Sequence, residues 1–246
     1  MPSMADPYSK IGWAKEHLDT LERALDSFCS AAPPQAYTIT REDDIEHGEH
    51  IITMEFHDIP PRICLIAGDA IYSMRAALDQ TVWALASLNG IPGRTQFPII
   101  ERWDTESEKR FAKQVASVPE GAFHEIQALQ PYHRGDAFKS HPLWRIDEIC
   151  NLDKHRRIPA HGTAVRAMFT GIDDPFDVIS EARGNCIVDR MPLSLKDKVH
   201  FNPESPVEVT FGGDHTSGIT ERFADLIGIY NFIANEVLPR FDRFFP

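Results

Sequence analysis

Two charged side chains within a long apolar stretch are the first candidates for chemistry. Arg75 and Asp79 lie in residues 62–89, a segment whose interior is otherwise almost entirely uncharged. Residues four apart lie on one face of a helix, so the guanidinium and the carboxylate can pair. A buried charge that loses its partner costs roughly 3–5 kcal/mol, so such a pair needs a structural or a chemical purpose. We expect Arg75 to be buried and bound to a carboxylate, with Asp79 or Asp153 as its partner.

A second group of chemically versatile side chains follows in the segment NLDKHRR, residues 151–157. Asn151 and His155 share a helix face, and the cations around His155 suit the negative end of a helix dipole. Residues 133–166 carry seven Lys or Arg against four Asp or Glu, together with four histidines. A local basic patch of this kind can bind a phosphate group or one nucleic-acid strand. The candidate site residues are Arg75, Asp79 and His155 for catalysis, and Asn151, Asp153, Lys154 and Arg156 for binding.

The motifs around these residues resemble those of a family of bacterial hypothetical proteins. They are GDAIYSMRAALDQTVWALA, QFPI at residues 96–99, LQPY at residues 129–132 and PLWRIDEICNLDKHRR, and the resemblance covers residues 60–157. Members often have His where this chain has Gln80, which gives Arg-x4-His, a spacing similar to the signature of the helical HEPN ribonucleases. The resemblance implies that Arg75 would stabilise phosphate charge and that a histidine would transfer protons. Gln80 has no titratable proton, so His155 would have to take over that role.

The composition limits the partners that the chain can have. Its 246 residues include 25 Lys or Arg and 37 Asp or Glu, a net charge of −12, which disfavours broad binding to duplex nucleic acid. No apolar run approaches the roughly 20 residues of a membrane span, and the first residues lack the pattern of a secretory signal. The four cysteines have no paired spacing, as in a reducing compartment. We expect a cytoplasmic protein that binds neither duplex nucleic acid nor a membrane; a homo-oligomer is compatible with these features.

Apolar residues at steps of three and four predict the helices that position the candidate residues. The helical segments are residues 8–31, 62–89, 105–157 in several pieces, and 219–245. The sequence TESE at residues 105–108 predicts a capping box, and Ser140 is expected to cap a helix that has Pro142 in its first turn. Pro239 should kink the last helix because it lacks a backbone N–H. Residues 62–89 are apolar on nearly every side, which predicts a place in the middle of a bundle.

Alternation with a period of two predicts antiparallel strands within residues 36–57 and 163–212. Residues 41–49, which contain the acidic run EDDIEHGE, are expected to be an exposed, mobile hairpin loop. His47 and His50 lie in or beside this run, but a zinc site needs three or four converging ligands, so we expect no metal there.

The fold class predicted from these elements is α+β, with residues 1–246 forming a single domain. We expect a helical bundle of about four main helices with a small antiparallel β-sheet packed beside it. Two classes of function fit the candidate residues. The first is a non-catalytic binding or regulatory domain in which Arg75, Asp79, Asp153 and His155 form a polar network. The alternative is a HEPN-like, metal-independent ribonuclease or nucleotide-binding protein of a defence or toxin system, acting on a phosphate-containing ligand or single-stranded RNA. The acidic charge and the missing histidine favour the first class, and neither class requires a cofactor.

Overall fold

The computed structural model describes residues 2–29, 36–155, 158–170, 177–180, 185–197, 200–202, 207–212 and 220–246. For residues 154–155, 163–170, 177–180, 185–189, 200–202 and 207–208 it describes the backbone alone. Lys154 and His155 are therefore placed only by their main chain, and Arg156 lies outside the described residues.

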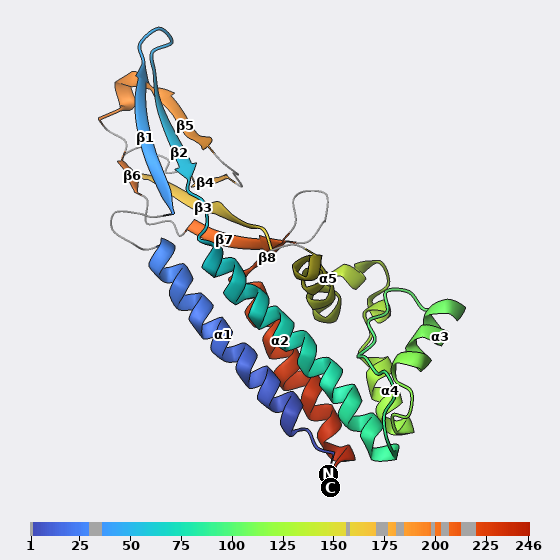
Figure 1. Ribbon diagram of the computed structural model, residues 1–246. Coiled ribbons are helices and arrows are strands. Elements are labelled where there is room, and N and C mark those ends of the chain that lie inside the picture. The colour runs from blue at the N-terminus through green and yellow to red at the C-terminus, as the bar shows by residue number, and fades with distance from the viewer. Residues whose placement is uncertain are drawn as a thin grey trace. The chain divides into compact units, whose positions relative to one another are not determined.

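The chain divides into two compact units, and it passes from one to the other several times. Unit 1 consists of Met1–Thr20, Leu65–Ile158 and Gly212–Pro246, and unit 2 consists of Leu21–Cys64 and Pro159–Phe211. Unit 1 is mainly helical and contains Arg75, Asp79, Asn151 and Asp153, whereas unit 2 contains most of the strands (Figure 1).

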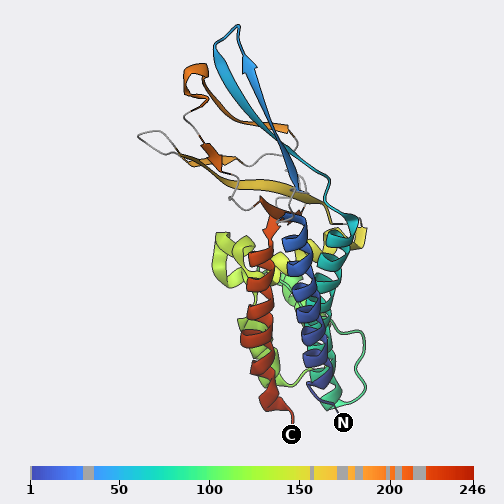
Figure 2. The same cartoon turned by 90° about the vertical axis from the view of Figure 1, so that its left-hand side faces the viewer.

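The helices of unit 1 follow the predicted order. They are α1 (Ala5–Cys29, in unit 1 up to Thr20), α2 (Pro61–Ala86, in unit 1 from Leu65), η1 (Ser87–Asn89), α3 (Thr105–Gln114), α4 (Glu120–Ala128), η2 (Pro131–Ser140), α5 (Pro142–His155) and α6 (Phe223–Asn231). A short strand, β8 (Thr220–Arg222), leads into α6. The helices α1, α2 and α6 run side by side in both ribbon views (Figures 1 and 2).

The start of each helix depends on its cap, and two of the predicted caps are wrong. The capping box of α3 is formed by Asp104 and Ser107 instead of the TESE residues. Asp104 accepts the backbone N–H of Ser107 at 2.8 Å and fills the cap position because its own backbone is extended. At α5 the residue next to Pro142 is His141, whose Nδ1 accepts the backbone N–H of Leu143 at 3.1 Å, so His141 caps this helix in place of Ser140.

The last helix loses its regular pattern ahead of Pro239, as predicted. After α6 the chain is π-helical over Phe232–Val237 (η4) and then forms a 3-10 helix over Leu238–Phe244 (η5). Proline has no N–H to donate to the carbonyl four residues earlier, so an unbroken α-helix cannot continue through it. The largest fully buried side chains of unit 1 come from α1, α2, α3 and η5 and from the connection after α2: Leu18, Ile71, Met74, Leu78, Leu85, Phe97, Ile100, Phe111 and Phe241.

Unit 2 contains antiparallel strands in two groups. The strands are β1 (Tyr37–Asp44), β2 (Glu49–Phe56), β3 (Ala160–Thr170), β4 (Asp177–Ser180), β5 (Asn185–Pro192), β6 (His200–Asn202) and β7 (Val207–Gly212, in this unit up to Phe211), and a short helix η3 (Leu193–Leu195) follows β5. In one group β2 pairs with β1 and β5, and in the other β3 pairs with β4, β6 and β7.

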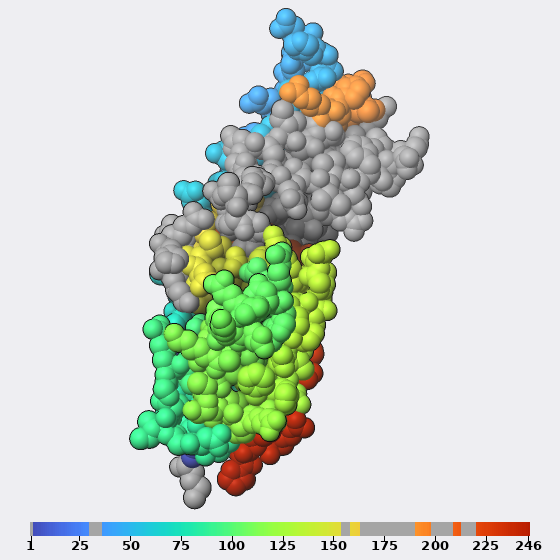
Figure 3. All heavy atoms as spheres, turned by 90° about the vertical axis from the view of Figure 1, so that its right-hand side faces the viewer, coloured from blue at the N-terminus to red at the C-terminus, as the bar shows by residue number. Residues whose placement is uncertain are grey.

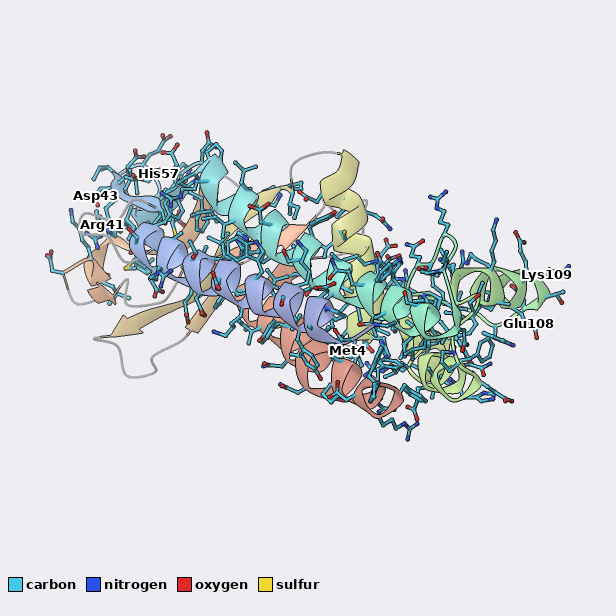
Figure 4. The ribbon with its side chains drawn as sticks, turned by 60° about the horizontal axis from the view of Figure 1, so that its bottom comes forward. Met4, Arg41, Asp43, His57, Glu108 and Lys109 are labelled. Atoms are coloured by element: carbon cyan, nitrogen blue, oxygen red, sulfur yellow. The ribbon has the colours of Figure 1, made fainter. Side chains whose placement is uncertain are left out.

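Four residues of the acidic run, 42–44 and 49, lie in strands β1 and β2 and not in a loop, so the predicted loop boundaries are wrong. Only residues 45–48 form the turn, in which Gly48 has a φ of 67°. Asp43 and His50 lie opposite each other in the strand register and interact at 2.6 Å, and Lys196 also pairs with Asp43. Figure 4 labels Arg41 and Asp43 at this hairpin. Lys196, which pairs with Asp43, and Arg190 of β5, which pairs with Glu49, therefore offset the repulsion that the composition predicted.

The combination of helices and antiparallel strands confirms the α+β class. Within the part of the chain that the structure describes, no helix is both long and apolar enough to cross a membrane.

Candidate functional site

The guanidinium of Arg75 is the buried centre of a polar network in unit 1. Its side chain is 5% exposed, and it lies within 3.3 Å of Asp79 and 3.4 Å of Asp147. Its Nη2 donates a hydrogen bond of 2.9 Å to the backbone carbonyl of Phe97. Two carboxylates and a carbonyl dipole thus surround one positive charge, which compensates the cost of burying it.

Asp79 binds the backbone of Phe97, the same residue whose carbonyl accepts a hydrogen bond from Arg75. Its Oδ1 accepts the backbone N–H of Phe97 at 2.9 Å, while Arg75 holds the Phe97 carbonyl. Both polar backbone atoms of Phe97 are therefore satisfied by side chains one turn apart on α2, and the Phe97 ring itself is fully buried. The Arg-x3-Asp spacing anchors the chain that returns from α2 to the core.

The LQPY motif at residues 129–132 also binds the backbone of the segment that follows α2. Gln130, itself buried, accepts the backbone N–H of Ile100 through Oε1 at 2.9 Å and donates through Nε2 to the carbonyl of Ile126 at 2.9 Å. The backbone N–H of Tyr132 donates to the carbonyl of Ile100 at 3.0 Å. Residues 97–100 are thus held by α2 at one end and by residues 130–132 at the other.

The motif PLWRIDEICNLDKHRR contacts Arg75 through side chains of α5. Asp147 contacts Arg75, and the amide of Asn151, one turn later, donates to Asp147 at 3.5 Å. The predicted ion pair of Arg75 with Asp79 is present, whereas Asp147 was not anticipated, because its contact with α2 arises from tertiary packing alone. We call the group Arg75, Asp79, Asp147, Asn151 and Gln130, with the backbone of residues 97–100, the Arg75 network.

Asp153 lies against a different part of α2. A Cβ atom placed on Gly68 would approach the Asp153 carboxylate to 3.0 Å, so the two helices come close because position 68 has no side chain. Burial, and then the nearby Asp69 carboxylate, raise the pKa of Asp153. These contacts give α5 a direction opposite to α2, since Arg75 meets Asp147 while Gly68 meets Asp153.

The helix geometry sets where the backbone of His155 lies. It follows Asp147 by eight residues on α5, which corresponds to roughly 12 Å of helix rise. Asp147 therefore lies at the level of Arg75, Asn151 lies one turn further along α5, and the main chain of His155 lies about two turns further along than Asp147.

Gln80, which follows Arg75 by five residues, is half-buried on α2. Its Oε1 is shielded from solvent and has no hydrogen-bond partner among the described residues.

Several Lys and Arg side chains of the predicted basic patch interact with other groups of the same chain. Arg145 makes a paired interaction with Glu221, which is 1% exposed, and it lies 3.4 Å from Asp225. Arg134 donates to the carbonyl of Ser140 at 2.9 Å. Lys139 lies over the ring of Trp144, 5.8 Å from its centre. Arg145 in particular is bound to carboxylates and does not present an unneutralised charge.

A solvent-facing row of residues runs along α2, contrary to the prediction that this helix is enclosed on every side. Leu65, Tyr72 and Trp83 are 60%, 56% and 52% exposed, and Ala76 between them is partly exposed. These four residues, which we call the α2 stripe, follow one another at helical spacing, while most other positions of α2 are buried. The sequence pattern does not reveal the stripe, because apolar residues occupy both the exposed and the buried positions of α2.

No cluster of three or more His, Cys, Asp or Glu with the geometry of a metal site occurs among the residues that the structure describes. His50 is buried against Asp43, and the ring of His47 pairs with Asp44 at 2.9 Å. Both histidines thus serve the hairpin.

Another face of unit 1 is built from α3, α4 and η2, whose residues cover the surface drawn in green and yellow-green in Figure 3. Glu125 of α4 receives Arg243 at 2.6 Å and Arg240 at 3.3 Å from η5, which ties this face to the end of the chain.

Comparison of the chain with family models, with curated proteins and with solved structures finds no match.

Proposed function

We propose that this chain is a non-catalytic binding domain of the bacterial cytosol, in which the Arg75 network holds the fold together. One observation carries the proposal: the hydrogen bonds and ion pairs of the four sequence motifs close on one another. Arg75 and Asp79 bind Phe97, Gln130 binds Ile100, and Asp147 binds Arg75. Side chains committed to their own backbone in this way stabilise a core instead of contacting a substrate.

The electrostatics of Arg75 support the same conclusion. A guanidinium that stabilises a phosphate in a transition state must face the substrate with its charge uncompensated. Arg75 is 5% exposed and has two carboxylates within 3.4 Å. An anionic ligand at this position would meet two negative charges and one positive charge, which is repulsive on balance.

The spacing along α5 argues against a shared Arg75–His155 site. Proton transfer needs direct contact or one intervening water, and roughly 12 Å of helix rise separates the level of Asp147 from that of His155. Asn151, which is at the closer level, has no group that titrates near neutral pH.

The finer architecture belongs to this proposal as well. We propose a single domain with a bundle of about four main helices and the antiparallel sheet packed beside it, located in the cytoplasm and working without a cofactor.

A HEPN-like, metal-independent ribonuclease or nucleotide-binding protein is the second candidate, and two observations favour it. The helices that carry the Arg75 motif and the NLDKHRR segment are packed against each other, as a shared site requires. In addition, Nη1 of Arg75 is buried without a hydrogen-bond acceptor among the described residues. A phosphate oxygen could fill that position only if Asp79 or Asp147 moved away.

Incubation of the purified chain with fluorescently end-labelled single-stranded RNA, without added metal, separates the two candidates. We expect the RNA to remain intact with the wild-type protein and with the Arg75→Ala and His155→Ala variants. Cleavage by the wild type that disappears in both folded variants would establish the ribonuclease and refute the binding domain.

A further inference from the structure

The α2 stripe extends along one side of unit 1 with no described segment of the unit covering it. Leu65 and Trp83 are 18 residues apart, so the stripe is roughly 27 Å long. Three large apolar side chains, each more than half exposed, lie on this single line. Contiguous exposed apolar surface of this kind marks an interaction site more often than isolated surface residues do.

Side chains of α1 extend the apolar surface next to the stripe. The ammonium group of Lys10 lies over the ring of Tyr72, 5.8 Å from its centre, so α1 and α2 are adjacent at this level. Trp13, one turn further along α1, is 49% exposed and packs its ring edge-on against His17 at 4.8 Å. Two neighbouring helices thus present exposed aromatic residues, against which an amphipathic helix can lay its apolar face.

Carboxylates accompany the stripe on α2 itself and on α5. Asp69 and Asp79 lie on α2, and Asp147, Glu148 and Asp153 lie on α5. Arg75 offsets only part of this charge, since it contacts Asp79 and Asp147 together. Burial, and then the neighbouring Asp69 carboxylate, raise the pKa of Asp153, so carboxylates of α2 and α5 lie near each other. The described surface beside the stripe is therefore apolar, with carboxylates toward α5 and the ammonium of Lys10 toward α1.

We propose that the α2 stripe binds an amphipathic helix of a partner protein that carries Lys or Arg along the edge of its apolar face that meets α5. This inference rests on the proposed function, because it names the partner of the binding domain. Leu65, Tyr72 and Trp83 would contact the apolar face, and Asp69 and the carboxylates of α5 would contact the cations. A helix of about 18 residues matches the length of the stripe.

Charge decides between this partner and other proteins or ligands that could cover the α2 stripe. A second copy of the chain would bring another net charge of −12 and would place carboxylates opposite carboxylates. Nucleic acid and anionic lipid are repelled for the same reason. A basic amphipathic helix alone satisfies both the apolar row and its acidic margin.

The probe for this inference is a synthetic helical peptide of about 18 residues, with Leu on one face and Lys on the other, labelled with fluorescein. A matched peptide has Glu in place of every Lys. Fluorescence anisotropy measures binding of each peptide to the full chain. We expect the Lys peptide to bind roughly tenfold or more tightly than the Glu peptide, with an affinity that falls as salt rises from about 50 to about 300 mM.

The Tyr72→Ser/Trp83→Ser double variant should weaken binding of the Lys peptide by roughly tenfold. Ile91→Ser is the control, because Ile91 is 99% exposed but lies beyond the end of the stripe, and this variant should bind like wild type. Asp69→Lys should weaken the Lys peptide and strengthen the Glu peptide. All of these positions are exposed, so the fold should survive, and circular dichroism verifies it.

Equal binding of the two peptides, or equal binding by wild type and the double variant, would overturn the inference and leave the proposed function standing. Sedimentation velocity gives a further outcome: a dimer that dissociates in the double variant would make a second copy the occupant and would also overturn it. Cleavage of RNA by the wild type would refute the proposed function itself, independently of the peptide results.

Discussion

Arg75 and Asp79 together bind the backbone N–H and carbonyl of a single residue, Phe97, and this contact explains their spacing in the sequence. The carboxylate accepts the N–H of Phe97 and the guanidinium donates to its carbonyl. Residues that appear chemically active in the sequence, a cation and an anion one helical turn apart, thus fix the path of an adjacent loop. The guanidinium is buried, and its charge is compensated by Asp79, by Asp147 and by the Phe97 carbonyl.

Removal of the Arg75 side chain should therefore be costly. We expect Arg75→Ala to lower the free energy of unfolding by roughly 3–5 kcal/mol, because Asp79 and Asp147 would lose the buried charge that balances them. Urea denaturation measures this loss. Lys15→Ala serves as the control, since Lys15 and Asp19 form an exposed pair on α1, and it should cost less than about 1 kcal/mol. Equal effects of the two variants would contradict a structural role for Arg75.

His141 provides a pH-dependent prediction. Burial, and then the charges of Arg134 and His133, lower the pKa of His141 to about 4, while an unfolded histidine titrates near 6.5. Above pH 6.5 both states are neutral and stability is complete. As pH falls from about 6.5 to about 4, the unfolded state takes up a proton that the folded state refuses, which costs on the order of 3 kcal/mol.

Urea denaturation at intervals between pH 7 and pH 4 should show this loss. The His141→Asn variant keeps an oxygen that can accept the Leu143 N–H but does not titrate, so its stability should fall less over the same range. Parallel curves for the two proteins would show that His141 is not the group responsible.

At the residue level, the sequence predicted what local spacing can reveal. The Arg75–Asp79 pair follows from a separation of four on a helix. Asp147 was missed because it lies on a different helix, and the attachment to Phe97 was missed because a backbone group carries no sequence signature. The residues responsible were recognisable, but their partners depend on tertiary packing.

Among the elements, helix interiors were predicted better than their ends. The long helix expected at residues 62–89 is α2 followed by η1, bounded by Gly90. The caps of α3 and α5 each lie one residue away from the pattern chosen, since Asp104 precedes TESE and His141 follows Ser140. The boundaries of the hairpin loop were predicted wrongly for a different reason. Strands tolerate an acidic run when cations pair with it, as Lys196 and Arg190 do here.

Contact between β2 and β3 gives a prediction at this scale. A Cβ atom on Gly162 would lie 2.7 Å from the ring of Phe56, so Gly162→Ala forces the ring or the strand that carries it to shift. We expect a loss of roughly 1–3 kcal/mol in the free energy of unfolding. Gly12→Ala is the matched control, because nothing lies within 4 Å of that position on α1 and alanine favours a helix by roughly 0.5–1 kcal/mol. A Gly162→Ala protein as stable as wild type would show that the close packing is not required.

For the whole molecule, the periodicity of apolar residues predicted the α+β class and the composition gave the sign of the charge, but neither predicted the division of the chain. The two compact units each draw on separate stretches of sequence, and such long-range association leaves no local pattern. The single domain predicted for residues 1–246 remains a prediction. The net charge of −12 is consistent with a partner that is basic and not a polyanion.

The central claim is that this scaffold binds and does not cleave, because Arg75 is neutralised within the core. The Gln80→His variant tests it most directly, since it restores the Arg-x4-His spacing on α2 without altering Arg75, Asp79 or Asp147. We predict that single-stranded RNA incubated with this variant remains intact. Cleavage by Gln80→His that is abolished when Arg75→Ala is added, in a protein that remains folded, would contradict the claim.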